Sequence, residues 1–291
     1  MSKILGIIGG MGPLATVNLF NKIVINTDAR SDQEHIHMLI DNNVNIPDRT
    51  AFLLGKGEDP TKELIKSATR LEKAGADFLI MPCNTAHHFY QVIKEKINID
   101  FLNMIEETVR FIQLKYPGVK KVGLLSTDGT LKAKIYDSYF NKQNIQVINP
   151  RKKIQDSVMD IIYGIKAGKK EIQIDAIYNA AEEFKAKGIG VFVLGCTELS
   201  IVNEMFKLEE EFASAAGAEN IAGAENIADV ENIADIGNIA GDENIAGETN
   251  IADGADAINA ADFIHAVDAL NVIVRRAIEF AGKNPSKRIP L

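Results

Sequence analysis

Residues 78–89 read FLIMPCNTAHHF, and residues 191–200 read VFVLGCTELS. In both stretches, a short apolar run of the length of a buried strand ends in a cysteine that polar residues follow. The chain has two cysteines, Cys83 and Cys196, and both lie in this setting. Because reactive groups of α/β sheets gather beyond the carboxyl ends of the strands, the two stretches predict strand-end thiols in an α/β fold.

Strands and helices alternate through most of the chain. Apolar runs predict strands at residues 3–8, 36–41, 78–81, 121–125, 145–148 and 191–194. Amphipathic stretches predict helices at residues 14–27, 61–74 and 86–96. Such alternation is typical of α/β folds with mainly parallel sheets, and we expect that fold class here.

The second half of this pattern repeats the first. The stretch GIIGGMGPL at residues 6–14 matches GLLSTDGTL at residues 123–131, at an offset of 117 (123 − 6). Aligning Cys83 with Cys196, at an offset of 113 (196 − 83), also places Gly75 on Gly188. We therefore expect two similar lobes related by a pseudo-twofold axis, with the cysteines flanking an active site in the cleft between them.

The composition is that of an ordinary globular protein. Of 291 residues, 46% are hydrophobic and 25% are charged, which is enough apolar material for a sizeable core. No cluster of basic and aromatic residues suggests nucleic acid, and no apolar run is long enough to span a bilayer. The N-terminal stretch MSKILGIIGG lacks the features of a signal peptide, and two distant cysteines give no disulfide framework. We expect a cytoplasmic protein without nucleic-acid or membrane partners.

A tandem repeat of six residues accounts for the acidic net charge of −8. Residues 217–256 contain ten Asp or Glu and no Lys or Arg, and each unit begins with Asn-Ile-Ala. The asparagines are Asn220, Asn226, Asn232, Asn238, Asn244 and Asn250. A period of six fits neither helix nor strand, so we expect a flexible surface insertion. A left-handed parallel β-helix stays open as the alternative.

Three segments follow from these patterns. We expect lobe 1 to comprise residues 1–102 plus 258–291, lobe 2 residues 103–206, and the acidic hexapeptide insertion residues 207–257.

Each cysteine precedes the start of an expected helix. Thr85 and Thr197 are suitable caps for these helices. Since the positive end of a helix dipole stabilises a thiolate, we expect a lowered pKa for both thiols. A single buried cysteine is more often a small core residue, but two at equivalent strand ends favour a catalytic role.

The two thiols could in principle bind zinc together with His87 and His88. This set is disfavoured because neighbouring histidines on a helix face apart, and His87 would point away from Cys83. Two thiols on opposite faces of a substrate carbon can instead remove one proton and return another. That is the chemistry of a racemase or an epimerase.

Five motifs resemble the aspartate racemase branch of the aspartate/glutamate racemase superfamily. They are GGMGPLAT at 9–16, IPDRT at 46–50, MPCNTAHHF at 81–89, GLLSTDGT at 123–130 and LGCTELS at 194–200. Residues 262–278 resemble the closing helix of the first lobe, so the resemblance covers nearly everything except about residues 207–257. Glutamate racemases typically begin with Asp-Ser-Gly and carry Thr-His after the second cysteine, whereas this chain has Gly-Gly-Met-Gly-Pro and Thr-Glu. The resemblance therefore favours aspartate over glutamate.

The resemblance implies a two-base amino-acid racemase without a cofactor, acting on aspartate and assembled as a homodimer. Cys83 and Cys196 would be the catalytic bases. The implied substrate-binding residues are Met11, Arg49, Asn84, Thr85, Thr127, Thr130, Lys166, Thr197 and Glu198. Of these, Arg49 and Lys166 would contact the distal carboxylate, although most Arg and Lys side chains are merely solvated surface cations.

Other functions stay open on the same scaffold. Glutamate or broad-specificity amino-acid racemase, hydantoin racemase, maleate isomerase and arylmalonate decarboxylase are alternatives within the superfamily. A non-catalytic amino-acid-binding protein is the alternative from a different class.

Overall fold

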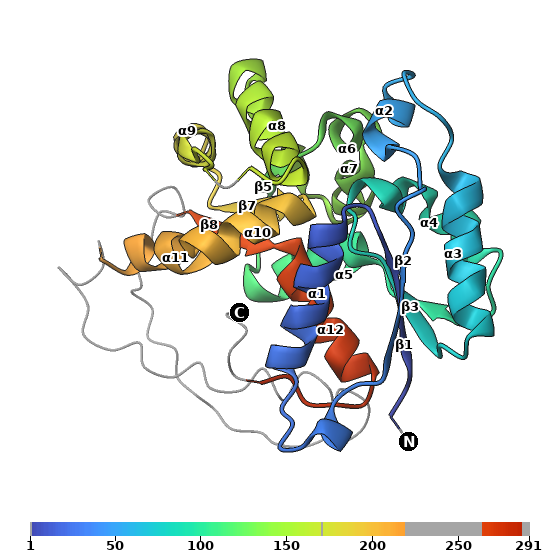
Figure 1. Ribbon diagram of the computed structural model, residues 1–291. Coiled ribbons are helices and arrows are strands. Elements are labelled where there is room, and N and C mark those ends of the chain that lie inside the picture. Colours follow the sequence, from blue (N-terminus) through green and yellow to red (C-terminus); the bar gives the residue numbers. More distant parts are fainter. Residues whose placement is uncertain (1, 170, 219–263, 287–291) are drawn as a thin grey trace.

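The computed structural model describes residues 2–169, 171–218 and 264–286, which form two parallel sheets surrounded by helices (Figure 1). The first sheet has the strand order β2 (Met38–Asn42), β1 (Leu5–Gly9), β3 (Phe78–Ile80) and β4 (Asp100–Phe101). The second has the order β6 (Gln146–Ile148), β5 (Lys121–Ser126), β7 (Val191–Gly195) and β8 (His265–Asp268). The order is the same in both sheets, and this confirms the predicted α/β fold of two similar lobes.

Equivalent glycines allow close packing in the central strand of each sheet. Gly6 in β1 pairs with Leu79, and a Cβ atom at Gly6 would lie 2.5 Å from the Leu79 side chain. Gly123 in β5 pairs with Phe192, and a Cβ atom there would lie 2.6 Å from the Phe184 ring. These two glycines are the ones that the duplicated sequence pattern aligns.

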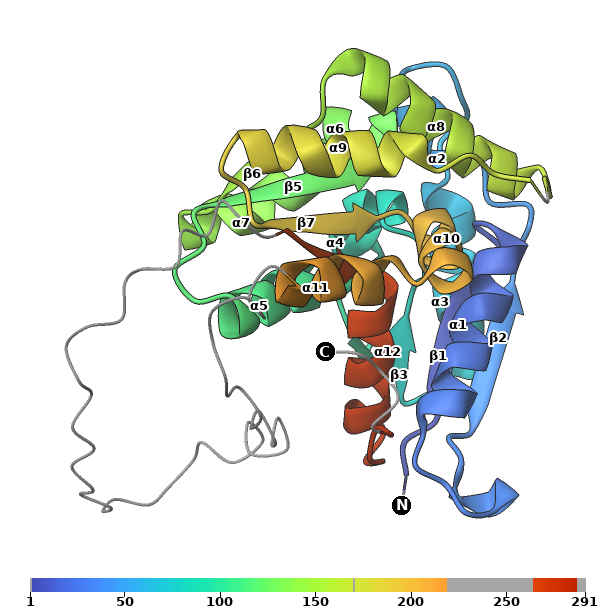
Figure 2. The ribbon, with the colours of Figure 1, turned by 90° about the vertical axis from the view of Figure 1, so that its left-hand side faces the viewer.

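Helices cover both faces of each sheet. In the first lobe, α1 (Pro13–Asn26) and α12 (Ala269–Phe280) lie on one face and α3 (Thr61–Lys73) on the other (Figure 1). In the second, α8 (Lys152–Lys166) and α9 (Asp175–Ala186) cover one face (Figure 2). The remaining helices are α2 (Arg49–Leu53), α4 (Tyr90–Lys94), α5 (Met104–Lys115), α6 (Asp128–Lys132), α7 (Ile135–Phe140), α10 (Thr197–Phe206) and α11 (Leu208–Ala218), with 3-10 helices at Asp32–Glu34, Thr85–Phe89 and Asn141–Gln143.

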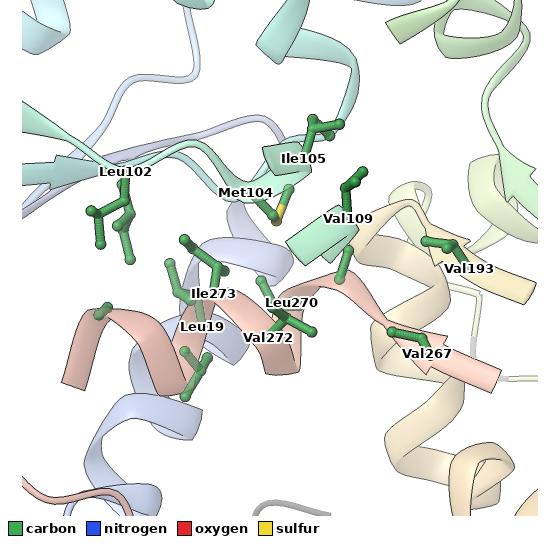
Figure 3. Packing of buried hydrophobic residues seen from close by; sticks show 14 of the residues in the cluster. Leu19, Leu102, Met104, Ile105, Val109, Val193, Val267, Leu270, Val272 and Ile273 are labelled. Carbon is green, nitrogen blue, oxygen red and sulfur yellow. The ribbon is translucent and has the colours of Figure 1, made fainter. Parts of the chain in front are cut away.

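One apolar core joins the two lobes. Leu19 of α1, Met104 of α5 and Leu270 of α12 are fully buried and belong to the same cluster (Figure 3). That cluster also contains Ile7 from the first sheet and Val193 from the second. The two sheets are therefore held in a fixed relation by shared helices rather than by a thin interface.

Two expected boundaries differ from the structure. We assigned residues 258–291 to lobe 1, but β8 pairs in parallel with β7 and completes the second sheet, because its buried Val267 fills the position beside Val193. We also assigned residues 207–257 to a flexible insertion. Residues 208–218 instead form α11, which packs its buried Leu208 and Phe212 on the second lobe. The hexapeptide repeats lie outside the described residues.

None of the described helices is both long and apolar enough to cross a membrane.

Candidate active site

The two cysteines lie at the carboxyl ends of equivalent strands, as predicted. Cys83 follows β3 after two residues, and Cys196 directly follows β7. Both are free thiols and both are buried, with exposed fractions of 6% and 5%. Each therefore reaches the edge of its sheet at the site where ligands bind in parallel α/β folds.

Cys196 lies at the start of a regular helix and contacts a carboxylate. It is the N-cap residue of α10, and its Sγ donates a hydrogen bond to Glu198 Oε2 at 2.9 Å. Burial raises the pKa of the Cys196 thiol well above its ordinary value, and the negative charge of Glu198 raises it further. Lys166 and the backbone N–H of Glu198 act in the opposite direction. The expected lowering of the Cys196 pKa is therefore wrong.

Cys83 has a different setting, in which a histidine holds its backbone. The Cys83 carbonyl oxygen lies 2.8 Å from His87 Nδ1, and His87 Nε2 accepts a hydrogen bond from Met104 N–H at 3.1 Å. The second contact places the proton on Nδ1, which donates to Cys83. Burial lowers the pKa of His87 to about 4, so its ring is neutral near pH 7.

The expectation that His87 points away from Cys83 was therefore wrong. We predicted one helix at residues 86–96, but residues 85–89 form a 3-10 helix that α4 follows. The tighter 3-10 turn brings the His87 ring back to the Cys83 carbonyl. Thr85 and Thr197 are not the caps either, because Asn84 and Cys196 occupy the N-cap positions.

Three buried hydroxyls join the lobes beside Cys83. Thr85 Oγ1 lies 2.9 Å from Thr127 Oγ1 and 3.0 Å from Thr130 Oγ1, and the latter two are 3.1 Å apart. Thr85 comes from the first lobe, and the others come from the start of α6 in the second. A hydroxyl both donates and accepts, so this ring can redirect its hydrogen bonds toward a ligand oxygen.

Asn84 presents an unused donor next to this ring. Its Oδ1 accepts a hydrogen bond from the Tyr136 hydroxyl at 2.6 Å, which fixes the orientation of the amide. Its Nδ2 is buried and has no hydrogen-bond partner in the described part of the chain. A buried donor without a partner is costly, and a ligand oxygen would satisfy it. Sequence reasoning missed Tyr136, which is fully buried on α7 and lies outside the five motifs.

Arg49 is buried rather than solvated. Its Nη1 donates to the carbonyl oxygens of Ile46 and Pro47, at 3.3 and 2.9 Å. Its Nη2 donates to the Met11 carbonyl oxygen at 3.0 Å, whereas its Nε has no partner among the described residues. Met11 thus contributes a backbone oxygen to the site. Three of the five guanidinium N–H groups hold two loops in place, and the two that remain, on Nε and Nη2, are available to a ligand.

Lys166 lies within electrostatic range of both cysteines. Burial by itself would lower the pKa of Lys166, but the negative charges of Glu198 and of both thiolates outweigh it, and the net pKa is raised. Its Nζ lies 5.1 Å from the centre of the Tyr163 ring. The structure therefore brings Lys166 and both predicted bases into one site.

The loops of the first lobe contact the second lobe at this site. Gly129 in α6 lies so close to α2 that a Cβ atom on it would be 2.8 Å from Thr50 Cα. A Cβ atom at Gly12 would lie 3.8 Å from Glu198 Oε1. Thr197 Oγ1 is 3.5 Å from Glu198 Oε2 and is buried. Every residue predicted for the site lies in the described part of the chain, and Tyr136 and His87 contact two of them, Asn84 and Cys83.

The chain is similar to known racemases over most of its length. Residues 8–229 match the family model described as Asp/Glu/Hydantoin racemase. The broad specificity amino-acid racemase RacX of Bacillus subtilis (strain 168) is 28% identical over 212 residues, which cover 70% of this chain and 89% of RacX. A glutamate racemase of Corynebacterium glutamicum is 27% identical over 150 residues, covering 50% of this chain and 52% of that protein.

Solved structures show the same architecture. The aspartate racemase of Picrophilus torridus superposes with a TM-score of 0.71 and 27% identity, covering 99% of this chain and 97% of that one. An aspartate racemase homologue from Pyrococcus horikoshii OT3 superposes with a TM-score of 0.61 and 21% identity, covering 97% of this chain and all of the other.

Proposed function

The chain belongs to the Asp/Glu/Hydantoin racemase family and is an amino-acid racemase, and we propose that it interconverts L- and D-aspartate with Cys83 and Cys196 as its two bases. The observation that carries this proposal is the pair of buried thiols at equivalent strand ends, with Lys166 near enough to both that their negative charges raise its pKa. A base on each side of one carbon is what inversion by proton transfer requires.

The reaction proceeds through a carbanion at Cα. One thiolate takes the Cα proton, forming an S–H bond, and the electron pair of the C–H bond moves into the α-carboxylate. The opposite thiol then gives its proton to the other face of Cα, and the electron pair returns to form the new C–H bond. The substrate leaves inverted, with one cysteine newly protonated and the other newly ionised.

The site supplies partners for the charge that develops in this step. Asn84 Nδ2 and the hydroxyl ring of Thr85, Thr127 and Thr130 are fixed, buried donors, suited to an α-carboxylate that gains electron density. Lys166 adds a positive charge in a poorly solvated place, where it acts more strongly than in water. Arg49 Nε, together with Lys166, would contact the distal carboxylate of aspartate.

A broad-specificity amino-acid racemase is the second candidate, and one observation favours it. Three of the five N–H groups of Arg49 already donate to the carbonyl oxygens of Ile46, Pro47 and Met11, so Nη1 has no N–H left and a distal carboxylate can use only one on Nε and one on Nη2. A weaker contact of this kind would discriminate less between aspartate and amino acids without a second carboxylate.

Deuterium exchange at Cα in heavy water tests the two candidates. We expect the fastest exchange and racemisation with aspartate, slower reaction with glutamate and the slowest with alanine, followed by NMR and chiral chromatography. Similar rates for all three would establish the broad-specificity enzyme. Absence of exchange with each of them would refute both candidates, even if aspartate bound.

A further inference from the structure

Glu198 contacts the sulfur of Cys196 from the first turn of α10. Its Oε2 accepts the thiol hydrogen bond at 2.9 Å, and the residue is 3% exposed. We included Glu198 among the substrate ligands. A buried carboxylate would repel both carboxylates of aspartate, so contact with the thiol is the chemistry that its position favours.

The charge of this pair limits how Cys196 can work. If the thiol gave up its proton beside an ionised Glu198, two negative charges would share one buried site. Burial and the Glu198 charge together raise the pKa of Cys196, which is the cost of forming that dianion. Lys166 offsets part of this cost, but it also faces Cys83 and the expected distal carboxylate.

We propose that Cys196 and Glu198 act as one acid–base unit that holds either one proton or two, with Glu198 as a catalytic residue. This inference rests on the proposed racemase function. With one proton, the unit has a net charge of −1, and the proton lies on sulfur or on Glu198 Oε2. With two protons, the unit is neutral. It never carries two negative charges.

In each half-reaction the unit then gains one proton from Cα or gives one proton to it. When Cys196 is the base, its proton moves along the 2.9 Å hydrogen bond to Glu198, and the thiolate takes the Cα proton, so that the unit ends with two protons. When Cys196 is the acid, the thiol gives its proton to Cα while Glu198 stays protonated, and the unit ends with one proton. A hydrogen bond from the Glu198 carboxyl group to the thiolate stabilises that state.

Thiolate formation can be measured without substrate. Cys83→Ser leaves Cys196 as the single thiol of the chain, and the ultraviolet absorbance of the thiolate can be followed against pH, with the chain lacking both cysteines as the blank. Adding Glu198→Gln removes the neighbouring charge, so we expect at least about tenfold more Cys196 thiolate at neutral pH. Glu204→Gln is the matched control, because Glu204 lies on the same helix with its side chain 46% exposed. The control should leave the titration unchanged.

The same substitution should lower catalysis in the chain with both cysteines. Glu198→Gln is expected to reduce kcat for aspartate about a hundredfold, with KM changed less than about threefold, because the acceptor for the thiol proton is lost. Glu198→Asp, which keeps a carboxylate, should recover part of kcat, and it replaces the glutamine variant if that one does not fold. More thiolate together with slower racemisation is the signature of the shared proton.

Two outcomes would overturn the inference. One is a fraction of Cys196 thiolate at neutral pH that Glu198→Gln changes by less than about twofold, and the other is a loss of catalytic efficiency in Glu198→Gln that is confined to KM. Failure of the proposed function would look different. In that case the unsubstituted protein would not exchange the aspartate Cα proton, whereas the coupling of Cys196 to Glu198 would still appear in the thiol titration.

Discussion

The two cysteine sites share the pattern of a buried strand that ends in a cysteine, and they differ in the residues that follow the cysteine. At the offset of 113 that aligns Cys83 with Cys196, Thr85 corresponds to Glu198 (85 + 113). In the first lobe this position carries a hydroxyl that joins a ring of threonines, and in the second it carries a carboxylate bonded to the sulfur. The two thiols occupy equivalent positions, but the residue two positions after the cysteine is a neutral threonine in the first lobe and a carboxylate in the second.

A second aligned position differs as well. His87 corresponds to Ser200 (87 + 113). His87 holds the Cys83 carbonyl, whereas the Ser200 hydroxyl donates to Asp268 Oδ1 at 2.6 Å and ties α10 to the start of α12. One lobe fixes its base through a neutral ring, and the other fixes the helix that carries its base.

This difference affects the kinetics in a restricted way. L- and D-aspartate have equal free energies, so kcat/KM must be the same in both directions whatever the bases are. Unequal bases can therefore appear in kcat and KM separately, and in the exchange of each enantiomer alone. The difference between the two lobes must therefore be measured in the half-reactions, that is, in proton removal from L-aspartate and from D-aspartate separately.

Replacing the cysteines tests that comparison most directly and should give the largest effect. Cys83→Ser and Cys196→Ser are each expected to lower racemisation at least about a thousandfold, because a serine hydroxyl ionises far above neutral pH. With one base left, each variant should still exchange the Cα proton of a single enantiomer, and the two should favour opposite ones. The measurement is deuterium incorporation from pure L- and pure D-aspartate.

Retention of racemisation by either serine variant would contradict the two-base mechanism. If both variants exchanged the same enantiomer, the assignment of the cysteines to opposite faces of Cα would be wrong. Circular dichroism of both variants controls for folding.

The second prediction concerns the neutral ring that supports Cys83. His87 has its pKa lowered from 6.5 to about 4 by burial, so the unfolded chain binds a proton more readily than the folded one. The folded state therefore keeps its full stability at pH values above the pKa of His87 in the unfolded chain. It loses stability as the pH falls toward the pKa of about 4 that His87 has in the folded chain. The loss amounts to about 3 kcal/mol of unfolding free energy.

Urea unfolding at about pH 7.5 and about pH 4.5 measures this term. His87→Gln should remove most of the pH-dependent difference, whatever its effect at neutral pH. His88→Gln is the matched control, since His88 is the adjacent histidine and is exposed. If the pH dependence of the unfolding free energy were the same in His87→Gln as in the unsubstituted chain, His87 would not be the source of that dependence.

The third prediction separates the substrate contact of Arg49 from its structural contacts. Arg49→Lys keeps the charge but cannot bond three carbonyl oxygens and still present an N–H to a ligand. We expect about a tenfold loss of kcat/KM for aspartate and a smaller loss for alanine. Arg151→Lys, at a side chain that is 70% exposed, should change neither.

Equal losses on the two amino acids would assign Arg49 to holding the loops at Met11 and Pro47. In that case the specificity for a second carboxylate, if the enzyme has one, would have to come from Lys166.

The sequence was sufficient for the features that repeat within the chain. Both cysteines, the strands that carry them and the equivalent glycines at 6 and 123 follow from apolar runs and from one alignment of the chain on itself. The substrate ligands came from motif resemblance, and the structure brings Thr85, Thr127 and Thr130 together across the lobes.

The features that depend on long-range packing could not be predicted. The Tyr136 bond to Asn84 joins residues 52 positions apart, and nothing in either local sequence indicates it. The position of β8 was missed because its four residues are too few for a periodic pattern and follow the acidic repeats. The raised pKa of Cys196 was missed because the helix dipole can be inferred from sequence, whereas burial cannot.

The last prediction concerns the acidic repeats and should have the smallest effect on either cysteine site. Glu209 near the start of α11 accepts a hydrogen bond from Asp268 N–H at the end of β8, and the Phe212 ring lies 5.3 Å from that of Phe192, which pairs with Ala266. Since α11 thus runs back along β8, a short connection can link its end to the start of that strand.

Replacing residues 219–256 by about ten Gly and Ser residues should change the unfolding free energy by less than about 1 kcal/mol, because loop-closure entropy depends weakly on length. Racemisation and the Cys196 titration should change less than about twofold, because both thiols are held by contacts outside the deleted segment. Loss of folding in the shortened chain would show that the repeats are structural, and the β-helix alternative would then be favoured.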